Sequence, residues 1–150
     1  MILPHKLATT NDQLTSRAGL LTIGQLMDSI QLAGRVDKHF PKPKSNRGFM
    51  PSTYIQTLVL MQHQGHFHLD EVRHLSEDTA LTDVLGLTTI PHASTLGAWL
   101  RKTGHSHESP LAWEAVNKAM LQAALHRRKK VTLDIDATEI VANKADAHWT

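Results

Sequence analysis

The stretch PSTYIQTLVLMQHQ, residues 51–64, decides the fold class. Pro51 suits the first turn of a helix, because its ring fixes φ and the N–H that it lacks would have no partner there. Tyr54, Leu58 and Met61 then recur on one face at helical spacing within a long apolar segment. This pattern predicts a buried central helix against which the other elements pack.

The segments on either side of this stretch also show helical spacing. Apolar residues recur over residues 20–30, and we expect Gly34 to close that helix. Residues 69–75 continue the pattern after the central helix, and residues 79–85 form a short helix with Gly86 as its C-terminal cap. The order is helix after helix with short connections, which indicates a mainly α domain.

A further short helix is expected over residues 94–103. Ser94 is placed to cap its start, and Gly104 is placed to end it. A helix that opens on polar residues and ends on Arg101 and Lys102 suits contact with DNA. Its spacing from the preceding short helix is that of a helix-turn-helix, although such pairs are also common in helical bundles that do not bind DNA.

The period of the apolar pattern changes near the end of the chain. Ser109 and Pro110 begin a long helix whose apolar stripe includes Trp113, and we expect Trp113 and Trp99 to lie in the core rather than to serve as stacking platforms. After it the apolar residues alternate, which predicts one β-strand with Val131, Leu133 and Ile135 on one face and Thr132, Asp134 and Asp136 on the other.

Charge is unevenly distributed along the 150 residues. The net charge is only +2 and the sequence pI is about 9.1, which fits a nucleic-acid partner without requiring one. Positive charge gathers at residues 38–47 and 126–130, and acidic residues gather between 70 and 83. Each basic cluster is open to two interpretations, a set of phosphate contacts or a solvated segment, and cations also favour the C-terminal end of a helix.

Nothing in the composition indicates a secreted or membrane protein. There are no cysteines, the first residues lack the apolar core of a signal peptide, and no apolar run approaches membrane-spanning length. We therefore expect a cytoplasmic protein with no membrane partner.

Asp134 and Asp136 are the chemical focus of the sequence. Two carboxylates at alternate positions of an apolar strand are unfavourable unless water or a hard cation such as Mg²⁺ or Mn²⁺ compensates their charge. Both alternatives, a strand end in water and a metal site, remain open from the residues alone. The closely spaced His63, His66 and His68 suggest zinc, but they span a predicted helix end and favour loop positions instead.

Several ordered motifs resemble those of DDE-type insertion-sequence transposases of bacteria. Residues 131–140, VTLDIDATEI, are similar to the first catalytic strand of the RNase H-like core in that family, and Asp136 matches the catalytic position better than Asp134. Upstream, the segments GHFHLDEV, SEDTALTDVLGL and PHASTLGAWLR follow one another as in the helical N-terminal region of these transposases. The resemblance covers roughly residues 15–150.

The resemblance implies a domain organisation and a chemistry. Residues 1–19 would be a flexible N-terminus, residues 20–130 a helical DNA-binding region, and residues 131–150 the beginning of a truncated RNase H-like catalytic domain. Family members use three acidic residues to hold two Mg²⁺ or Mn²⁺ ions that activate the attacking oxygen. Only the first acid, Asp136 with Asp134 as runner-up, is matched, so we expect this chain alone to bind no such ions and to be inactive in strand cleavage and transfer.

The function implied is binding of the terminal repeats of the element. The expected DNA-binding residues are Ser94, Thr95, Arg101, Lys102, Lys42, Lys44, Arg47, Arg127, Arg128, Lys129 and Lys130. Two alternatives accompany it: an inactive, partly folded gene product, and an interaction module that pairs with itself or with full-length transposase and inhibits it.

Overall fold

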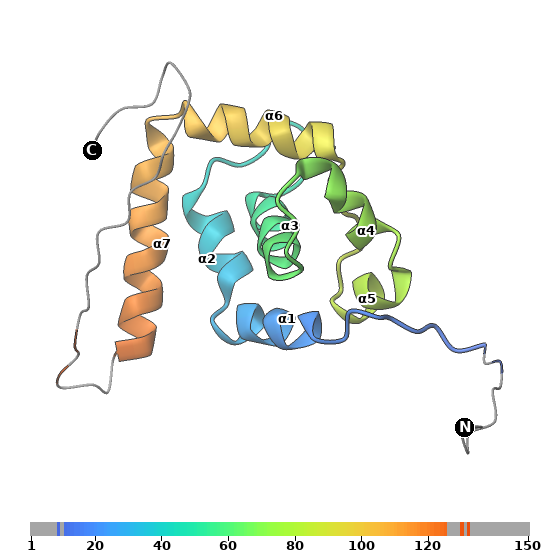
Figure 1. The fold of residues 1–150 in the computed structure, drawn as a ribbon. Coiled ribbons are helices and arrows are strands. Elements are labelled where there is room, and N and C mark those ends of the chain that lie inside the picture. The colour runs from blue at the N-terminus through green and yellow to red at the C-terminus, as the bar shows by residue number, and fades with distance from the viewer. Residues whose placement is uncertain (1–8, 10, 126–129, 131, 133–150) are drawn as a thin grey trace.

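The computed structural model describes residues 9, 11–125, 130 and 132, and every regular element within them is helical (Figure 1). The mainly α prediction is confirmed for this part of the chain. The predicted strand, with Asp134 and Asp136, lies outside the described residues except for Thr132. The elements are α1 (Leu20–Ser29), α2 (Leu32–His39), α3 (Pro51–His63), the 3₁₀ helix η1 (Leu69–Val72), α4 (Arg73–Ser76), α5 (Thr79–Val84), α6 (Ala93–Gly104) and α7 (Glu108–Leu125).

Helix α3 is the centre of the bundle, as the stretch at 51–64 predicts. Figure 1 shows α1, α2, α4 and α6 arranged around it. Tyr54 and Met61 are buried and Leu58 is partly buried against the same core, while Leu60 is fully buried. Thr57 is also fully buried, because its hydroxyl donates a hydrogen bond of 2.7 Å to the carbonyl of Thr53 one turn earlier.

The first break in the chain differs from the prediction. Gly34 does not close α1; it lies inside α2, and the turn occurs at Gln31, which adopts a left-handed φ of 53°. Arg35 stabilises this junction, since its Nε donates to the carbonyl of Ile30 at 2.7 Å and its Nη1 donates to the carbonyl of Ala119 at 2.9 Å. The sequence pattern placed this turn at Gly34, three residues later. The tertiary hydrogen bond from α2 to α7 supports it at Gln31 instead.

Helices η1, α4 and α5, together with the two residues between α4 and α5, form what we call the acidic corner, which contains Asp70, Glu71, Glu77, Asp78 and Asp83 (Figure 1). Asp78 caps α5 by accepting a hydrogen bond from the backbone N–H of Leu81 at 3.0 Å. Its other oxygen accepts from the Thr15 hydroxyl at 2.7 Å and from Arg17 at 3.0 Å, so the chain just before α1 is bonded to this corner. Gly86 follows α5 with a φ of 65°, as a C-terminal cap requires.

The last two helices begin earlier than the sequence predicts. Helix α6 starts at Ala93, with the His92 side chain accepting from the N–H of Ser94, so Ser94 lies in the first turn and is not the cap. Gly104 ends α6 as expected. Helix α7 starts at Glu108, which places Pro110 third rather than first in the helix. It packs against α2 at one side of the bundle, and Trp113 is 39% exposed rather than buried.

Among the helices that the structure describes, none has both the length and the apolar character needed to cross a membrane.

Candidate nucleic acid interface

Residues 40–50 connect α2 to α3, and we call this segment the basic loop. It is held at both ends. Phe40 is buried at its start. Beyond its end, the two carboxylate oxygens of Asp37 accept hydrogen bonds from the backbone N–H of Ser52 at 2.8 Å and from the Ser52 hydroxyl at 2.7 Å. Asp37 therefore acts as an N-terminal cap for α3 from another helix and brings the two ends of the basic loop together.

An aromatic cluster supports the loop from below. Tyr54 of α3 and Trp99 of α6 stack with ring centroids 4.8 Å apart and an interplanar angle of 9°. Phe49 meets Tyr54 edge to face at 5.8 Å, and Phe40 meets Trp113 in the same way at 5.1 Å. Burial raises the pKa of Tyr54 above its ordinary value, so its hydroxyl stays neutral at physiological pH. These ring contacts connect the basic loop, α3, α6 and α7.

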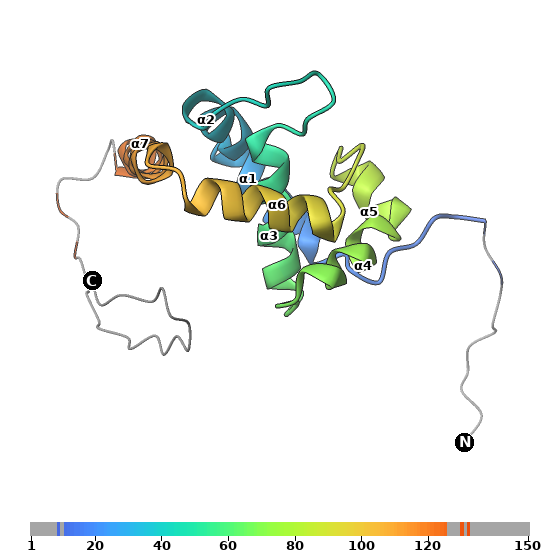
Figure 2. The same cartoon turned by 90° about the horizontal axis from the view of Figure 1, so that it is seen from above.

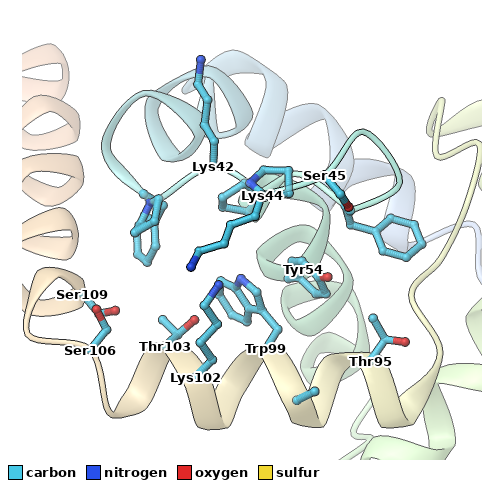
Figure 3. A pocket seen from close by; sticks show the side chains of 17 residues that line it. Lys42, Lys44, Ser45, Tyr54, Thr95, Trp99, Lys102, Thr103, Ser106 and Ser109 are labelled. Atoms are coloured by element: carbon cyan, nitrogen blue, oxygen red, sulfur yellow. The ribbon is translucent and has the colours of Figure 1, made fainter.

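A cavity of about 340 Å³ lies between the basic loop, the first turn of α3 and one face of α6. Figure 3 shows Lys44 of the loop and Lys102 of α6 pointing toward one another across it, with Trp99 and Tyr54 as its wall, while Lys42 points away into solvent. The hydroxyl-bearing residues of the lining are Ser45, Thr95, Thr103, Ser106 and Ser109, with Tyr54 in the wall.

The charge around the cavity is positive and is not neutralised by the described part of the chain. No carboxylate is found among the described residues that line it. Lys42, Lys44 and Lys102 are exposed, and none of them forms a hydrogen bond or ion pair with a described residue. Ammonium groups that converge without an acidic partner attract anions, and phosphate is the anion that nucleic acids present in series.

The structure brings together four of the predicted DNA-binding residues: Thr95, Lys102, Lys42 and Lys44 all line this cavity. Thr95, Trp99 and Lys102 lie four and three residues apart and so share a face of α6. Arg101 lies about 100° further round the helix. Its guanidinium folds back over Gly97, where an added Cβ would lie 3.3 Å from Nη1.

The other predicted residues are not in the cavity lining. Ser94 is exposed in the first turn of α6, with its hydroxyl 3.2 Å from the ring nitrogen of His92, and Arg47 is exposed on the basic loop. Lys130 is exposed as well. Five predicted residues lie outside the described part of the chain, namely Arg127, Arg128, Lys129, Asp134 and Asp136.

Sequence reasoning missed the aromatic wall. Trp99 was expected in the core; it packs against the core but is only partly buried, and it also lines the cavity. Its spacing from Thr95 and Lys102 was a usable signal, because all three had to share one helical face. The basic loop lies over that face because residues about 50 positions apart in the sequence contact one another. No local sequence pattern encodes such contacts.

His66, which follows α3, contacts two other side chains. His66 stacks with His74 at 5.3 Å, and its Nδ1 lies 3.4 Å from Glu71. Glu71 also accepts from the backbone N–H groups of His68 and Phe67, and the His68 bond is the main reason that the pKa of this carboxyl is lowered. Over the residues that the structure describes, no group of three or more His, Cys, Asp or Glu side chains is arranged to hold a metal ion.

Comparison with models of protein families, with curated proteins and with solved structures gave no significant match for this chain.

Proposed function

We propose that this chain is the DNA-binding part of a DDE-type insertion-sequence transposase and that it binds the ends of the element. The observation that carries the proposal is the cavity between the basic loop and α6, where lysines from two distant segments converge without a described carboxylate. The ordered motifs from Gly65 to Arg101 and from Val131 to Ile140, which resemble those of this family, support the same function.

In this proposal α5 and α6 are the helix-turn-helix pair, and α6 is the recognition helix. The exposed Ser94 and Arg101 read base edges, while Lys42, Lys44 and Lys102 contact phosphates beside the groove. Arg47, Arg127, Arg128, Lys129 and Lys130 add further phosphate contacts. Phosphate contacts position the helix and supply most of the salt-dependent affinity, and base contacts supply the specificity.

Fluorescence anisotropy with a labelled terminal-repeat duplex and a random duplex tests the proposal. The double variant Lys44→Ala/Lys102→Ala should bind both duplexes more weakly, and the slope of log K against log salt should become shallower by about 2, since each lost phosphate contact removes roughly 0.9. Arg73→Ala/Lys118→Ala removes the same charge from exposed positions elsewhere and should bind as the parent does. Absence of binding to either duplex at low salt would refute the proposed function.

The catalytic part of the proposal rests on the resemblance alone. Asp136, with Asp134 as runner-up, is proposed as the first of the three acids that bind Mg²⁺ or Mn²⁺ in intact family members. A cytoplasmic location is part of the same proposal. Strand cleavage and transfer use three such acids in the family, and DNA binding is the activity that we propose for the residues described above.

A second candidate function is an interaction module that pairs with itself or with full-length transposase. It is favoured by α7, which buries Ala112 and Val116 but leaves Leu111 and Leu121 exposed at 68% and 58%. A partner that covers these apolar side chains would remove their surface from water, which favours association. Sedimentation velocity should show self-association that Leu111→Lys/Leu121→Lys abolishes, whereas a chain that stays monomeric and does not co-purify with full-length transposase would exclude this function.

A further inference from the structure

The cavity under the basic loop has features that binding to a continuous duplex does not need. Lysines on an open surface suffice for phosphate contacts, but here they stand over a recess of about 340 Å³ with an aromatic wall. We propose that the recess is a subsite for one unpaired nucleotide of DNA, its base against the half-buried ring of Trp99, which is backed by the buried Tyr54, and its phosphate between Lys44 and Lys102. This inference rests on the proposed DNA-binding function.

The wall fits the base of a nucleotide. Nucleobases are flat and aromatic, and single-stranded nucleic acids bind proteins chiefly by placing bases against aromatic side chains above a basic groove. A paired base is held inside the duplex stack and cannot enter a recess, so the occupant has to be unpaired. The lining is mostly apolar, with Phe40, Phe49, Tyr54 and Trp99 among its residues, as contact with a base rather than with a phosphate requires.

The rim fits the sugar and phosphate. Lys44 and Lys102 come from opposite sides of the recess and point toward one another in Figure 3, so a single phosphate between them would contact both ammonium groups. Thr103 and Ser106 of the lining lie on the same side as Lys102 and offer hydroxyls to the edge of a base. The Thr103 hydroxyl can donate or accept, and the Ser106 hydroxyl, which accepts from the N–H of Glu108 at 3.2 Å, can still donate. This favours a site that tolerates different bases.

The recess is also built before any ligand arrives. The stacked pair Tyr54–Trp99 is braced by Phe49 on one side and Phe40 on the other. The basic loop above it is fixed through Asp37 and Ser52. A site whose walls are ordered in the free protein loses little conformational entropy on binding. The recess should therefore discriminate between DNA with and without an unpaired nucleotide at its end.

The experiment compares three forms of one labelled terminal-repeat duplex by fluorescence anisotropy: blunt, with a short single-stranded overhang on either strand, and with the same overhang made of abasic nucleotides. We expect an overhang to bind about tenfold more tightly than the blunt duplex, since one base on an aromatic wall contributes roughly that much. The abasic overhang keeps the phosphates, so it should lose this gain.

Two variants assign the effect to the recess. Lys44→Ala/Lys102→Ala removes the groups that hold the phosphate of the unpaired nucleotide over the aromatic wall and should reduce the preference for the overhang, and Arg73→Ala/Lys118→Ala should keep it in full, with far-UV circular dichroism confirming that both are folded. Equal binding of the blunt and overhang duplexes, or equal binding of the normal and abasic overhangs, would overturn the subsite while leaving DNA binding intact. Failure of all three duplexes to bind would overturn both the subsite and the proposed function.

Discussion

The basic loop and the acidic corner use their charged side chains in opposite ways. In the acidic corner, Asp78 bonds to Leu81, Thr15 and Arg17, and Glu71 bonds to two backbone N–H groups. In the basic loop and on the facing side of α6, Lys42, Lys44 and Lys102 bond to no described residue. Views along two directions show the two regions at different sides of the bundle (Figures 1 and 2).

The difference separates structural charges from those free to bind a ligand. A carboxylate that accepts two or three hydrogen bonds stabilises the fold and has little capacity left for a ligand. Exposed ammonium groups contribute little to stability but set the local potential. Substitutions in the acidic corner should therefore change stability and not DNA binding, and those of the lysines should do the reverse.

The largest effect on stability is expected for Asp78→Ala. The substitution removes the cap of α5 and the bonds from Thr15 and Arg17, all centred on a side chain only 8% exposed. The free energy of unfolding should fall by about 2–3 kcal/mol, measured by urea denaturation. DNA affinity of the folded fraction should not change. A loss of affinity without loss of stability would contradict the division between the two regions.

A smaller loss, about 1–2 kcal/mol, is expected for Asp37→Ala. It removes both hydrogen bonds to Ser52 and so the external cap of α3. Because Asp37 also fixes the basic loop, this variant should weaken DNA binding a few-fold, unlike Asp78→Ala. Asp37→Asn keeps one acceptor and one donor and should lie between the variant and the parent. The same order in urea denaturation and in anisotropy would link loop geometry to binding, and unchanged affinity in Asp37→Ala would break that link.

Lowering the pH should reduce the stability that Asp78 of the acidic corner contributes to the fold. Burial alone would raise the pKa of Asp78, but the hydrogen bonds from Thr15, Leu81 and Arg17 outweigh it and lower the pKa from its ordinary value of 3.8. The stabilisation is therefore complete above that value and is lost as pH falls through the lowered pKa of the folded state. Thermal denaturation between about pH 5 and about pH 2 should show a steeper loss for the parent than for Asp78→Asn, which cannot titrate. Parallel curves would show that Asp78 does not contribute to the pH dependence.

The helices could be predicted because local spacing determines them. Pro51 and the apolar residues after it mark α3, and Gly86 and Gly104 mark ends where the structure has them. The break after α1 could not be placed, because it is Gln31 and not Gly34 that takes the left-handed conformation, with Arg35 bonded across to α7. A pattern within one helix does not contain a hydrogen bond to a residue 84 positions away.

The candidate site was predictable only in part for the same reason. Lys44 was predicted within the basic cluster at residues 38–47, and Lys102 was predicted at the basic end of a helix. Their convergence depends on Asp37 capping α3 and on Tyr54 stacking on Trp99, which are tertiary contacts. Arg101 was grouped with Lys102 by adjacency in sequence, but neighbouring residues of a helix point in different directions.

Gly48 in the basic loop and Gly86 at the end of the acidic corner allow the two regions to be compared by the addition of a single methyl group. A Cβ at Gly48 would lie 2.5 Å from Cβ of Pro43, so Gly48→Ala should displace the basic loop. Gly86 has open space but a left-handed backbone. Gly86→Ala should lower stability by about 1 kcal/mol and leave DNA affinity unchanged. Because residues 44–48 are exposed and pack little against the core, Gly48→Ala should lower stability by less and yet weaken DNA binding a few-fold. If Gly48→Ala bound DNA as the parent does, the position of the basic loop over α6 would not matter for binding.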